Sequence, residues 1–202
     1  MKIVRREVLL CRGAFADSVL WHQTRARLEK AILAVDWPPG SGEFTIYPEA
    51  GKKRAEGNGV TPIKTGLMDD LRRQGWRLEE SLDLATRQIP GKLDAVYDTD
   101  FGPVALEWET GNISSSHRAL NKMALGLLKG RLACGILVVP SRKFYTYLTD
   151  RIGNMAELEP YLDLWRSIPC EAGVLEIIVI EHDATSTAVP RIPKGTSGRA
   201  LG

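Results

Sequence analysis

The sequence predicts an α/β domain with a mixed central sheet of about five strands flanked by helices. The chain of 202 residues is long enough for one domain with a real hydrophobic core. Short apolar runs of strand length alternate with stretches whose apolar residues recur at helical spacing. We therefore expect a single domain over residues 1–202, ending in a flexible tail over 190–202 that is rich in Pro, Gly, Ser and Lys.

The first predicted helix follows Asp17, a residue type that often caps a helix N-terminus. One face of this helix is formed by Leu28, Ala31, Ile32 and Val35. The run Pro38-Pro39-Gly40 ends it, and residues 43–47 have the composition of a short strand. A second helix is predicted over about 65–75.

Two strands are predicted next to each other, at Leu93–Tyr97 and Val104–Glu109, with a turn between them. A helix follows from Ser115, and Gly130 stands where a residue beyond a helix C-terminus often lies. The remaining predicted elements are strands at Gly135–Val139 and Val174–Ile180 and helices at about 142–151 and 156–167.

Composition argues against several classes of protein. The net charge of +2 favours no particular partner. The three cysteines are widely spaced and form no C-x-x-C pair, which argues against a disulfide framework and a zinc ribbon. The longest apolar run, Ala133–Val139, is too short to cross a membrane, and the N-terminus has no secretory signal. We expect a soluble cytoplasmic protein without a membrane partner.

Three carboxylates come together if the strands at Leu93–Tyr97 and Val104–Glu109 pair as a hairpin. Glu107 and Glu109 point to the same side of their strand, and Asp94 lies beside that strand's end. Such acids repel one another unless a divalent cation lies between them, and oxygen ligands favour Mg²⁺, Mn²⁺ or Ca²⁺. A metal site of this kind suits phosphoryl transfer.

The spacing of these acids is close to the nuclease pattern written PD…(D/E)xK, but the match is weak. Gly91-Lys92-Leu93-Asp94 stands in place of the PD element, and Glu109 stands where lysine is commoner. On spacing alone an ordinary solvated strand end is the favoured interpretation, since short motifs often match by chance.

The residues after the acids have side chains that recognise nucleic acids. Gly111–Arg118 leads into a helix N-terminus, which attracts phosphate. The candidate base-reading residues are Asn112, Ser114, Ser115, Arg118, Asp150 and Arg151. Lys52, Lys53 and Lys64 are candidates for phosphate contacts, although the charge run at 52–54 is also typical of a solvated loop.

With these residues in view, the chain resembles the BamHI family of type II restriction endonucleases. The similarity covers residues 43–198, nearly the whole chain. Its most specific stretch is Glu109-Thr110-Gly111-Asn112-Ile113-Ser114-Ser115, followed by His117-Arg118. Further shared stretches are Phe44-Thr45-Ile46, Asn58-Gly59-Val60, Pro62-Ile63-Lys64, Asn121-Lys122 and Leu148-Thr149-Asp150-Arg151.

The resemblance implies a restriction-endonuclease-like fold and a role for each acid. Asp94 bridges the two metal ions of the site, while Glu107 and the backbone carbonyl of Trp108 hold one of them. Glu79 holds the second metal; by pattern alone Glu80 is as good a candidate. Glu109 is the general base or positions the attacking water. The residues that match the family's base readers are Asn112, Ser114, Arg118, Asp150 and Arg151.

The resemblance also implies the substrate and partners. A homodimer cuts double-stranded DNA at GGATCC after the first G, leaving 5′ overhangs. Two Mg²⁺ ions serve each active site; Mn²⁺ substitutes for them, and Ca²⁺ binds without supporting cleavage. The host is a bacterium with a cognate DNA methyltransferase, which is not a binding partner.

Departures from the family leave other functions open. The chain ends at Gly202 without the family's lysine-rich C-terminal helix, and the residues at the dimer-interface positions differ. A repair or structure-selective nuclease needs the same acids without the base readers. A non-cleaving DNA-binding protein needs a lost acid, whereas Glu79, Asp94, Glu107 and Glu109 are all present.

Overall fold

A six-stranded mixed sheet forms the centre of the protein, in the order β1-β7-β6-β5-β4-β3. The computed structural model describes residues 1–51, 56–85, 91–109, 111–149 and 152–194. The six strands are β1 (Lys2–Arg12), β3 (Arg77–Glu80), β4 (Leu93–Tyr97), β5 (Val104–Trp108), β6 (Cys134–Pro140) and β7 (Gly173–Glu181). The strands β5, β6 and β7 are parallel, and antiparallel neighbours flank them on both sides. The predicted mixed sheet is confirmed, with six strands instead of five.

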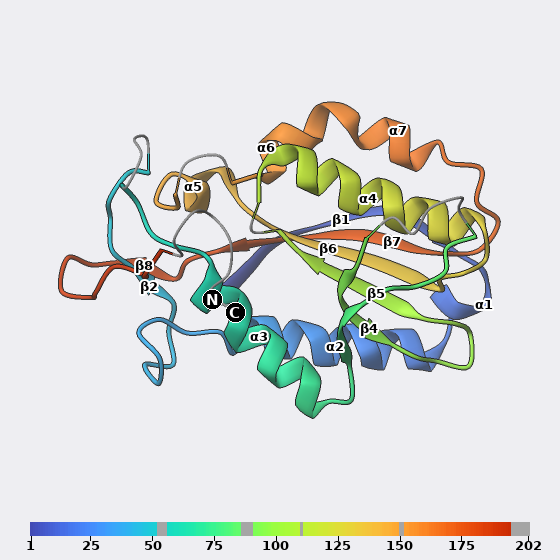
Figure 1. Ribbon diagram of the computed structural model, residues 1–202, viewed down its shortest axis with the longest axis horizontal. Coiled ribbons are helices and arrows are strands. Elements are labelled where there is room, and N and C mark those ends of the chain that lie inside the picture. Colours follow the sequence, from blue (N-terminus) through green and yellow to red (C-terminus); the bar gives the residue numbers. More distant parts are fainter. Residues whose placement is uncertain (52–55, 86–90, 110, 150–151, 195–202) are drawn as a thin grey trace.

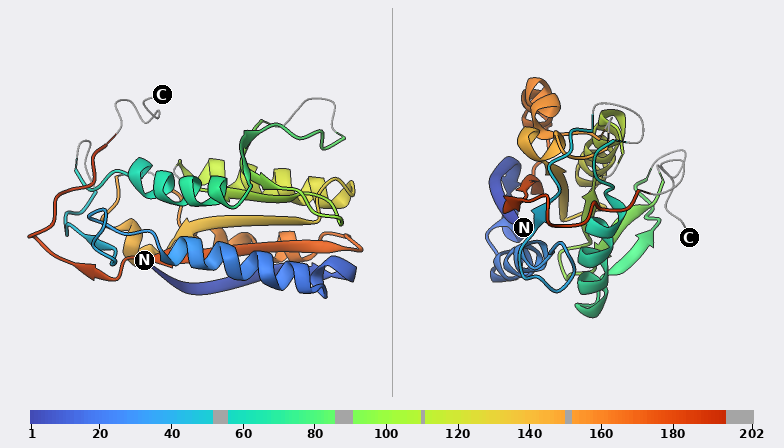
Figure 2. Two further views of the ribbon diagram at one scale, coloured as in Figure 1. Left: turned by 90° about the horizontal axis from the view of Figure 1, so that it is seen from below. Right: turned by 90° about the vertical axis from the view of Figure 1, so that its left-hand side faces the viewer.

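Helices cover both faces of this sheet (Figure 1). The helices α2 (Val19–Leu33) and α3 (Thr61–Arg73) lie on one face, and α4 (Ile113–Leu128) and α7 (Leu162–Arg166) lie on the other. The right-hand view of Figure 2 shows the same layers from one end of the molecule. Each face has its own buried core, and the two cores share the apolar sheet between them.

Side-chain caps fix where the main helices begin. Ser18, not Asp17, caps α2 by accepting a hydrogen bond from the Trp21 amide, so the predicted start was wrong by one residue. Asn112 caps α4 by accepting a hydrogen bond from the Ser115 amide, which moves that start from Ser115 back to Ile113. Gly130 lies just beyond α4 with a left-handed φ of 60°, as its position in the sequence predicted.

Two strands of the sheet, β1 and β3, were not predicted. The first half of β1 carries charged residues, which hide its strand character, and their side chains are neutralised on the protein surface. Arg6 pairs with Glu29 of α2, and Arg5 and Arg166 both pair with Glu7. Charged side chains on an edge strand also discourage pairing with other chains.

The second half of the chain contains shorter elements than predicted. The helix expected over 142–151 is one turn, α5 (Arg142–Tyr145). The helix expected over 156–167 is three short pieces, α6 (Met155–Leu158), η1 (Glu159–Tyr161) and α7. Pro160 stands at the start of η1 and supplies no amide to continue the helix before it. The predicted strand over 43–47 is reduced to β2 (Thr45–Ile46), which pairs with β8 (Ala184–Thr185).

The core is built as the apolar pattern predicted. Trp21, Trp37, Trp76 and Trp165 are all buried, as is Cys134, and the three cysteines are free thiols. His182, which follows the end of β7, is also buried. No helix in the described residues has the length and apolarity needed to span a membrane.

One buried side chain joins three loops beside the sheet. Asn58 is fully buried, and its Nδ2 donates to the carbonyls of Tyr47 and Tyr147 at 2.9 and 2.8 Å. Its Oδ1 accepts from the Ile192 amide at 3.0 Å. The neighbouring glycines pack directly against these loops: a Cβ on Gly59 would lie 1.9 Å from the Pro193 carbonyl oxygen. The loops that end near residues 149 and 194 are therefore held at one point.

We predict that Asn58→Ala lowers the free energy of unfolding by about 2–4 kcal/mol, because the Ile192 amide loses its acceptor and the Tyr47 and Tyr147 carbonyls each lose one of two donors. Urea unfolding at constant m-value measures this loss. Gln74→Ala, at the surface end of α3, is the matched control and should change stability by less than about 0.5 kcal/mol. A loss for Asn58→Ala no larger than that of the control would contradict the prediction.

Candidate active site

The register of β4 and β5 places two carboxylates opposite each other. Ala95 pairs with Leu106 and Val96 with Ala105, so the next pair along the hairpin is Asp94 with Glu107. Asp94 Oδ2 accepts a hydrogen bond from the Trp108 amide at 2.8 Å. Both acids are mostly buried, with side-chain exposures of 13% for Asp94 and 14% for Glu107. Two like charges therefore face one another with little water between them.

Glu107 is paired with a buried lysine from helix α4. Lys122 Nζ forms an ion pair with Glu107 Oε1 and donates to the Lys92 carbonyl at 2.5 Å. Burial, and then the nearby charge of Asp94, raise the pKa of Glu107 to about 7, while Lys122 offsets only part of this effect. Glu107 is thus a carboxylate that is only partly ionised at neutral pH when no other cation is near.

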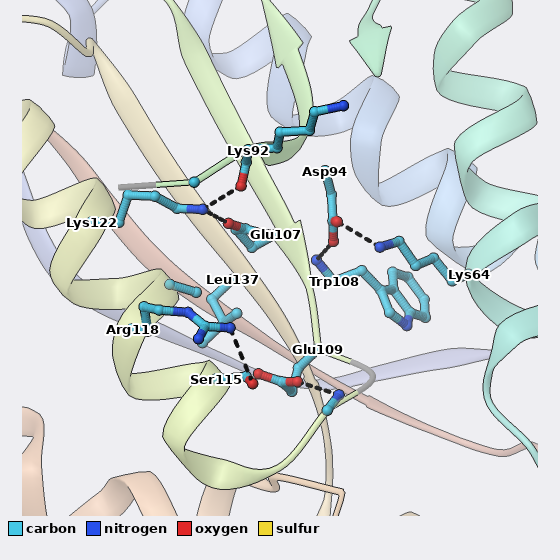
Figure 3. A pocket seen from close by; sticks show the side chains of 13 residues that line it. Lys64, Lys92, Asp94, Glu107, Trp108, Glu109, Ser115, Arg118, Lys122 and Leu137 are labelled. Carbon is cyan, nitrogen blue, oxygen red and sulfur yellow. Dashed lines mark hydrogen bonds and ion pairs between the residues drawn. The ribbon is translucent and has the colours of Figure 1, made fainter. Parts of the chain in front are cut away.

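Asp94 has its own lysine partner, from helix α3. Lys64 Nζ lies 2.5 Å from Asp94 Oδ1, and the lysine side chain is 24% exposed. Lys64, a predicted phosphate contact, is thus paired with Asp94 in this structure. Figure 3 shows Lys64 and Lys122 approaching the acids from opposite sides.

Glu109 lies just beyond β5 and is held by the start of helix α4. Ser116 Oγ, which is fully buried, donates to Glu109 Oε2 at 2.7 Å, and the Gly111 amide donates to Oε1. Burial raises the pKa of Glu109, and the two donors lower it less than burial raises it. A Cβ on Gly111 would lie 3.1 Å from Glu109 Oε1, so glycine suits this close approach.

The three acids line one open pocket of about 430 Å³. Lys64, Lys122 and Arg118 also line it, so that cations and carboxylates alternate around its wall (Figure 3). Trp108 contributes to this wall and also belongs to the hydrophobic core. The wall of the pocket is therefore mostly charged, and it rests on the hydrophobic core through Trp108.

The oxygen ligands at the hairpin fit a hard divalent cation, although the acids are not gathered around one point. Within the part of the chain that the structure describes, no three Asp, Glu, His or Cys side chains are grouped as a metal site. The opposed pair Asp94 and Glu107 nevertheless offers oxygen ligands whose mutual repulsion a divalent cation would relieve. Lysine ammonium groups now provide that positive charge.

Glu79 lies outside the pocket, on the edge strand β3. Its neighbours Leu78 and Glu80 pair with Ala95 and Leu93, the residues on either side of Asp94. Glu79 is exposed and has a left-handed φ of 54°, which is uncommon for a residue with a Cβ. Glu80, the alternative from the pattern, also does not line the pocket and lies near Arg77.

The N-terminal end of α4 carries four of the predicted base readers beside the pocket. Asn112, Ser114 and Arg118 are exposed, and Ser115 is half-buried. Arg118 and Ser115 both line the pocket, and Arg118 Nη2 lies 3.4 Å from Ser115 Oγ. His117 packs against Tyr161 and Trp165.

Four predicted DNA contacts, Lys52, Lys53, Asp150 and Arg151, lie outside the described residues. The chain that follows Arg151 is attached to the start of α4, because the Gly153 amide donates to the Gly111 carbonyl at 2.8 Å. A Cβ on Gly153 would lie 2.5 Å from Ser116 Oγ, the group that holds Glu109. The segment carrying Asp150 and Arg151 is thus joined at one end to the surroundings of an acid.

Two residues of the site were not identified from the sequence. Ser116 and Lys122 face the acids from α4, but a serine and a lysine within an amphipathic helix carry no motif of their own. The i, i+4 spacing of Lys122 from Arg118 would have been a signal, but it requires knowing which strand the helix covers.

Comparison with known proteins identifies the family. The model of the family described as "Restriction endonuclease BamHI" matches residues 1–199. The chain belongs to the BamHI family of restriction endonucleases. It is a type II restriction enzyme, that is, a site-specific deoxyribonuclease.

Two curated members of the BamHI family are similar over most of their length. The type II restriction enzyme OkrAI of Oceanobacter kriegii is 45% identical over 201 residues, covering 100% of both chains. The type II restriction enzyme BamHI of Bacillus amyloliquefaciens is 34% identical over 188 residues, covering 89% of this chain and 83% of BamHI. Restriction endonucleases are generally metal-dependent, and the acids described above are the natural candidates for that requirement.

The fold is also that of a restriction endonuclease. A crystal structure of BglII in complex with a DNA 16-mer superposes with a TM-score of 0.64 at 12% identity, covering 91% of this chain and 79% of BglII. The predicted restriction-endonuclease-like fold is confirmed. DNA binding follows from membership of the BamHI family.

We predict that Glu107 makes the metal-free protein less stable as pH rises. Its pKa is about 7 in the folded protein against an ordinary value of 4.5. The folded state therefore holds the proton more strongly, and stability falls between these values, by roughly 3 kcal/mol at most. Urea unfolding in EDTA at pH 5 and pH 8 should show Glu107→Gln gaining stability relative to wild type at the higher pH. An equal difference between the two proteins at both pH values would contradict this.

Proposed function

We propose that this enzyme cleaves double-stranded DNA at a palindromic site, GGATCC, after the first G, acting as a homodimer with a divalent metal ion. The observation that carries this proposal is the single pocket lined by Asp94, Glu107 and Glu109 beside the N-terminus of α4. It unites acids suited to phosphodiester hydrolysis with side chains suited to base reading. The similarity to OkrAI and BamHI over nearly the whole chain supports the same conclusion.

In the proposed reaction, Glu109 orients a water molecule and takes its proton. The Glu109 carboxylate is held by Ser116 and Gly111, so it cannot swing away from the pocket. The water oxygen attacks the scissile phosphorus as the bond to the 3′-oxygen breaks, and the leaving oxygen takes up a proton. The raised pKa of Glu109 makes it a stronger base than an exposed carboxylate.

Asp94 and Glu107 are the proposed protein ligands of the metal, with the Trp108 carbonyl beside them and Glu79 at a second position. When bound, Mg²⁺ supplies charge that stabilises the phosphate and the leaving oxygen in the transition state. Mn²⁺ is the expected substitute, and Ca²⁺ is expected to bind without supporting cleavage. Glu79 requires a change at the β3 edge to join the other acids, since it is exposed and outside the pocket.

Base recognition is assigned to the α4 N-terminus and to Asp150 and Arg151. Asn112 uses its Oδ1 to cap α4, which leaves its Nδ2 to donate to a base edge. Arg118 is exposed at the pocket mouth and suits bidentate contact with guanine. A homodimer places two such surfaces on the two half-sites of a palindrome. Lys52, Lys53 and Lys64 are the proposed phosphate contacts.

A plasmid digest in Mg²⁺ tests the proposed function directly. Discrete fragments whose ends map to GGATCC, with 5′ overhangs, are the expected result. A smear of fragments would favour a nuclease without this recognition site, and intact DNA that shifts in a gel would favour a non-cleaving binding protein. Analytical ultracentrifugation with a GGATCC duplex should show two protein chains per duplex.

We predict that Asp94→Asn and Glu109→Lys abolish cleavage while leaving specific DNA binding largely intact. Asparagine at position 94 keeps an oxygen to accept the Trp108 amide, so the hairpin is preserved. Gel-shift affinity and single-turnover cleavage on one GGATCC duplex measure both effects. Asp98→Asn, an exposed acid on the far end of the same hairpin, is the control and should cut at the wild-type rate. Full cleavage by either site variant would refute its assignment.

We predict that Arg118→Ala weakens binding to GGATCC by about 1–3 kcal/mol and relaxes discrimination at one base pair. Among the described residues the Arg118 guanidinium forms one long hydrogen bond, to Ser115, so most of the loss should come from the DNA side. Competition gel shifts against duplexes with each single base change measure this. Arg73→Ala, an exposed arginine at the end of α3, is the matched control. An equal loss on random DNA would reassign Arg118 to a phosphate contact.

A further inference from the structure

Lys122 is the most buried lysine beside the acids and has no role in the proposed reaction. Its side chain is 6% exposed, and it lies in the middle of α4 with its ammonium directed into the pocket. Its two partners there are Glu107 Oε1 and the Lys92 carbonyl. A lysine is rarely buried without a charge to meet, so this position calls for an explanation.

The opposed acids explain why a cation is present. Without positive charge, Asp94 and Glu107 face each other across the hairpin with little solvent between them. Lys122 neutralises Glu107 from one side, and Lys64 neutralises Asp94 from the other. The opposed pair of acids in the metal-free pocket thus has two internal counter-ions, and the charges of these four side chains balance.

Because lysines already neutralise the acids, a divalent cation must compete with them for the carboxylates. A divalent cation at Glu107 would lie close to the Lys122 ammonium, and the two positive charges would repel each other strongly in a partly buried site. Lys64 is better placed to leave, because its side chain is four times as exposed as that of Lys122 (24% against 6%). Lys122 is held by the helix that also forms one of the two cores. Competition between Lys122 and the metal ion for Glu107 therefore affects metal binding more than competition between Lys64 and the metal ion for Asp94.

We propose that Lys122 is a built-in counter-ion that holds Glu107 in place in the metal-free enzyme and competes with the divalent metal ion for it. Metal binding breaks the contact between Lys122 and Glu107 and leaves the ammonium beside the pocket, one helical turn from Arg118. Lys122 is thus a positioning residue that sets how tightly the metal binds. The inference rests on the proposed metal-dependent reaction.

Metal affinity without DNA tests this proposal. Mn²⁺ is titrated into each protein, and free Mn²⁺ is measured by electron paramagnetic resonance. Lys122→Met should lower the Kd for Mn²⁺ by about tenfold or more, equivalent to about 1.4 kcal/mol. Lys122→Arg keeps the charge and should not lower it. Lys143→Met removes an exposed lysine paired with Glu181 and is the matched control, with an unchanged Kd.

An unchanged or higher Kd for Lys122→Met would overturn the proposal, because a competitor's removal must strengthen binding. Circular dichroism verifies that each variant is folded, and Lys122→Gln replaces Lys122→Met if the latter is not. A second measurement uses the wild-type protein. Acetylation of Lys122 by an N-hydroxysuccinimide ester, followed by peptide mass spectrometry, should become faster in saturating Mn²⁺, while that of Lys143 stays the same. Equal rates for Lys122 with and without Mn²⁺ would also overturn it.

The outcomes separate this inference from the proposed function. Discrete GGATCC fragments together with an unchanged Mn²⁺ affinity in Lys122→Met would remove only the role of Lys122. Failure of the wild-type enzyme to cut DNA in any divalent metal would remove the proposed function itself.

Discussion

The antiparallel register of β4 and β5 is the constraint on which the active site depends. It fixes Asp94 across from Glu107 within a sheet that is apolar on both faces, where like charges are costly. Lysines of the two neighbouring helices reduce this electrostatic cost. Lys64 of α3 pairs with Asp94, and Lys122 of α4 pairs with Glu107. The hydrophobic packing of these helices and the charge balance of the pocket are therefore parts of one arrangement.

Helix α4 has three structural tasks, and its sequence separates them by position. Its first turn presents Asn112 and Ser114 to solvent. Its next turn directs Ser116 toward Glu109. Farther along, Leu120, Met123 and Leu127 are buried against the sheet and anchor the whole element. A rigid helix is a better support for such a site than a loop, because its core contacts fix the side chains at its start.

The sequence predicted an element correctly where the periodicity of its apolar residues matches the face that the fold buries. The hairpin strands and α4 were predicted because apolar residues recur with the period of each element, and Gly130 marks the end of the helix. β1 was missed because Arg5, Arg6 and Glu7 find their partners on distant elements. Lys122 and Ser116 were also missed, because their partners Glu107 and Glu109 belong to another element. The place of Glu79 outside the pocket depends on the backbone conformation of an edge strand, which no pattern encodes.

The bond between Gly153 and Gly111 has a consequence for protein engineering. It ties the segment after Arg151 to the backbone that holds Glu109, and no larger residue fits at position 153 without displacing Ser116. Replacement of Gly153 would therefore disturb the surroundings of Glu109 as well. Any redesign of that segment must therefore retain both Gly111 and Gly153.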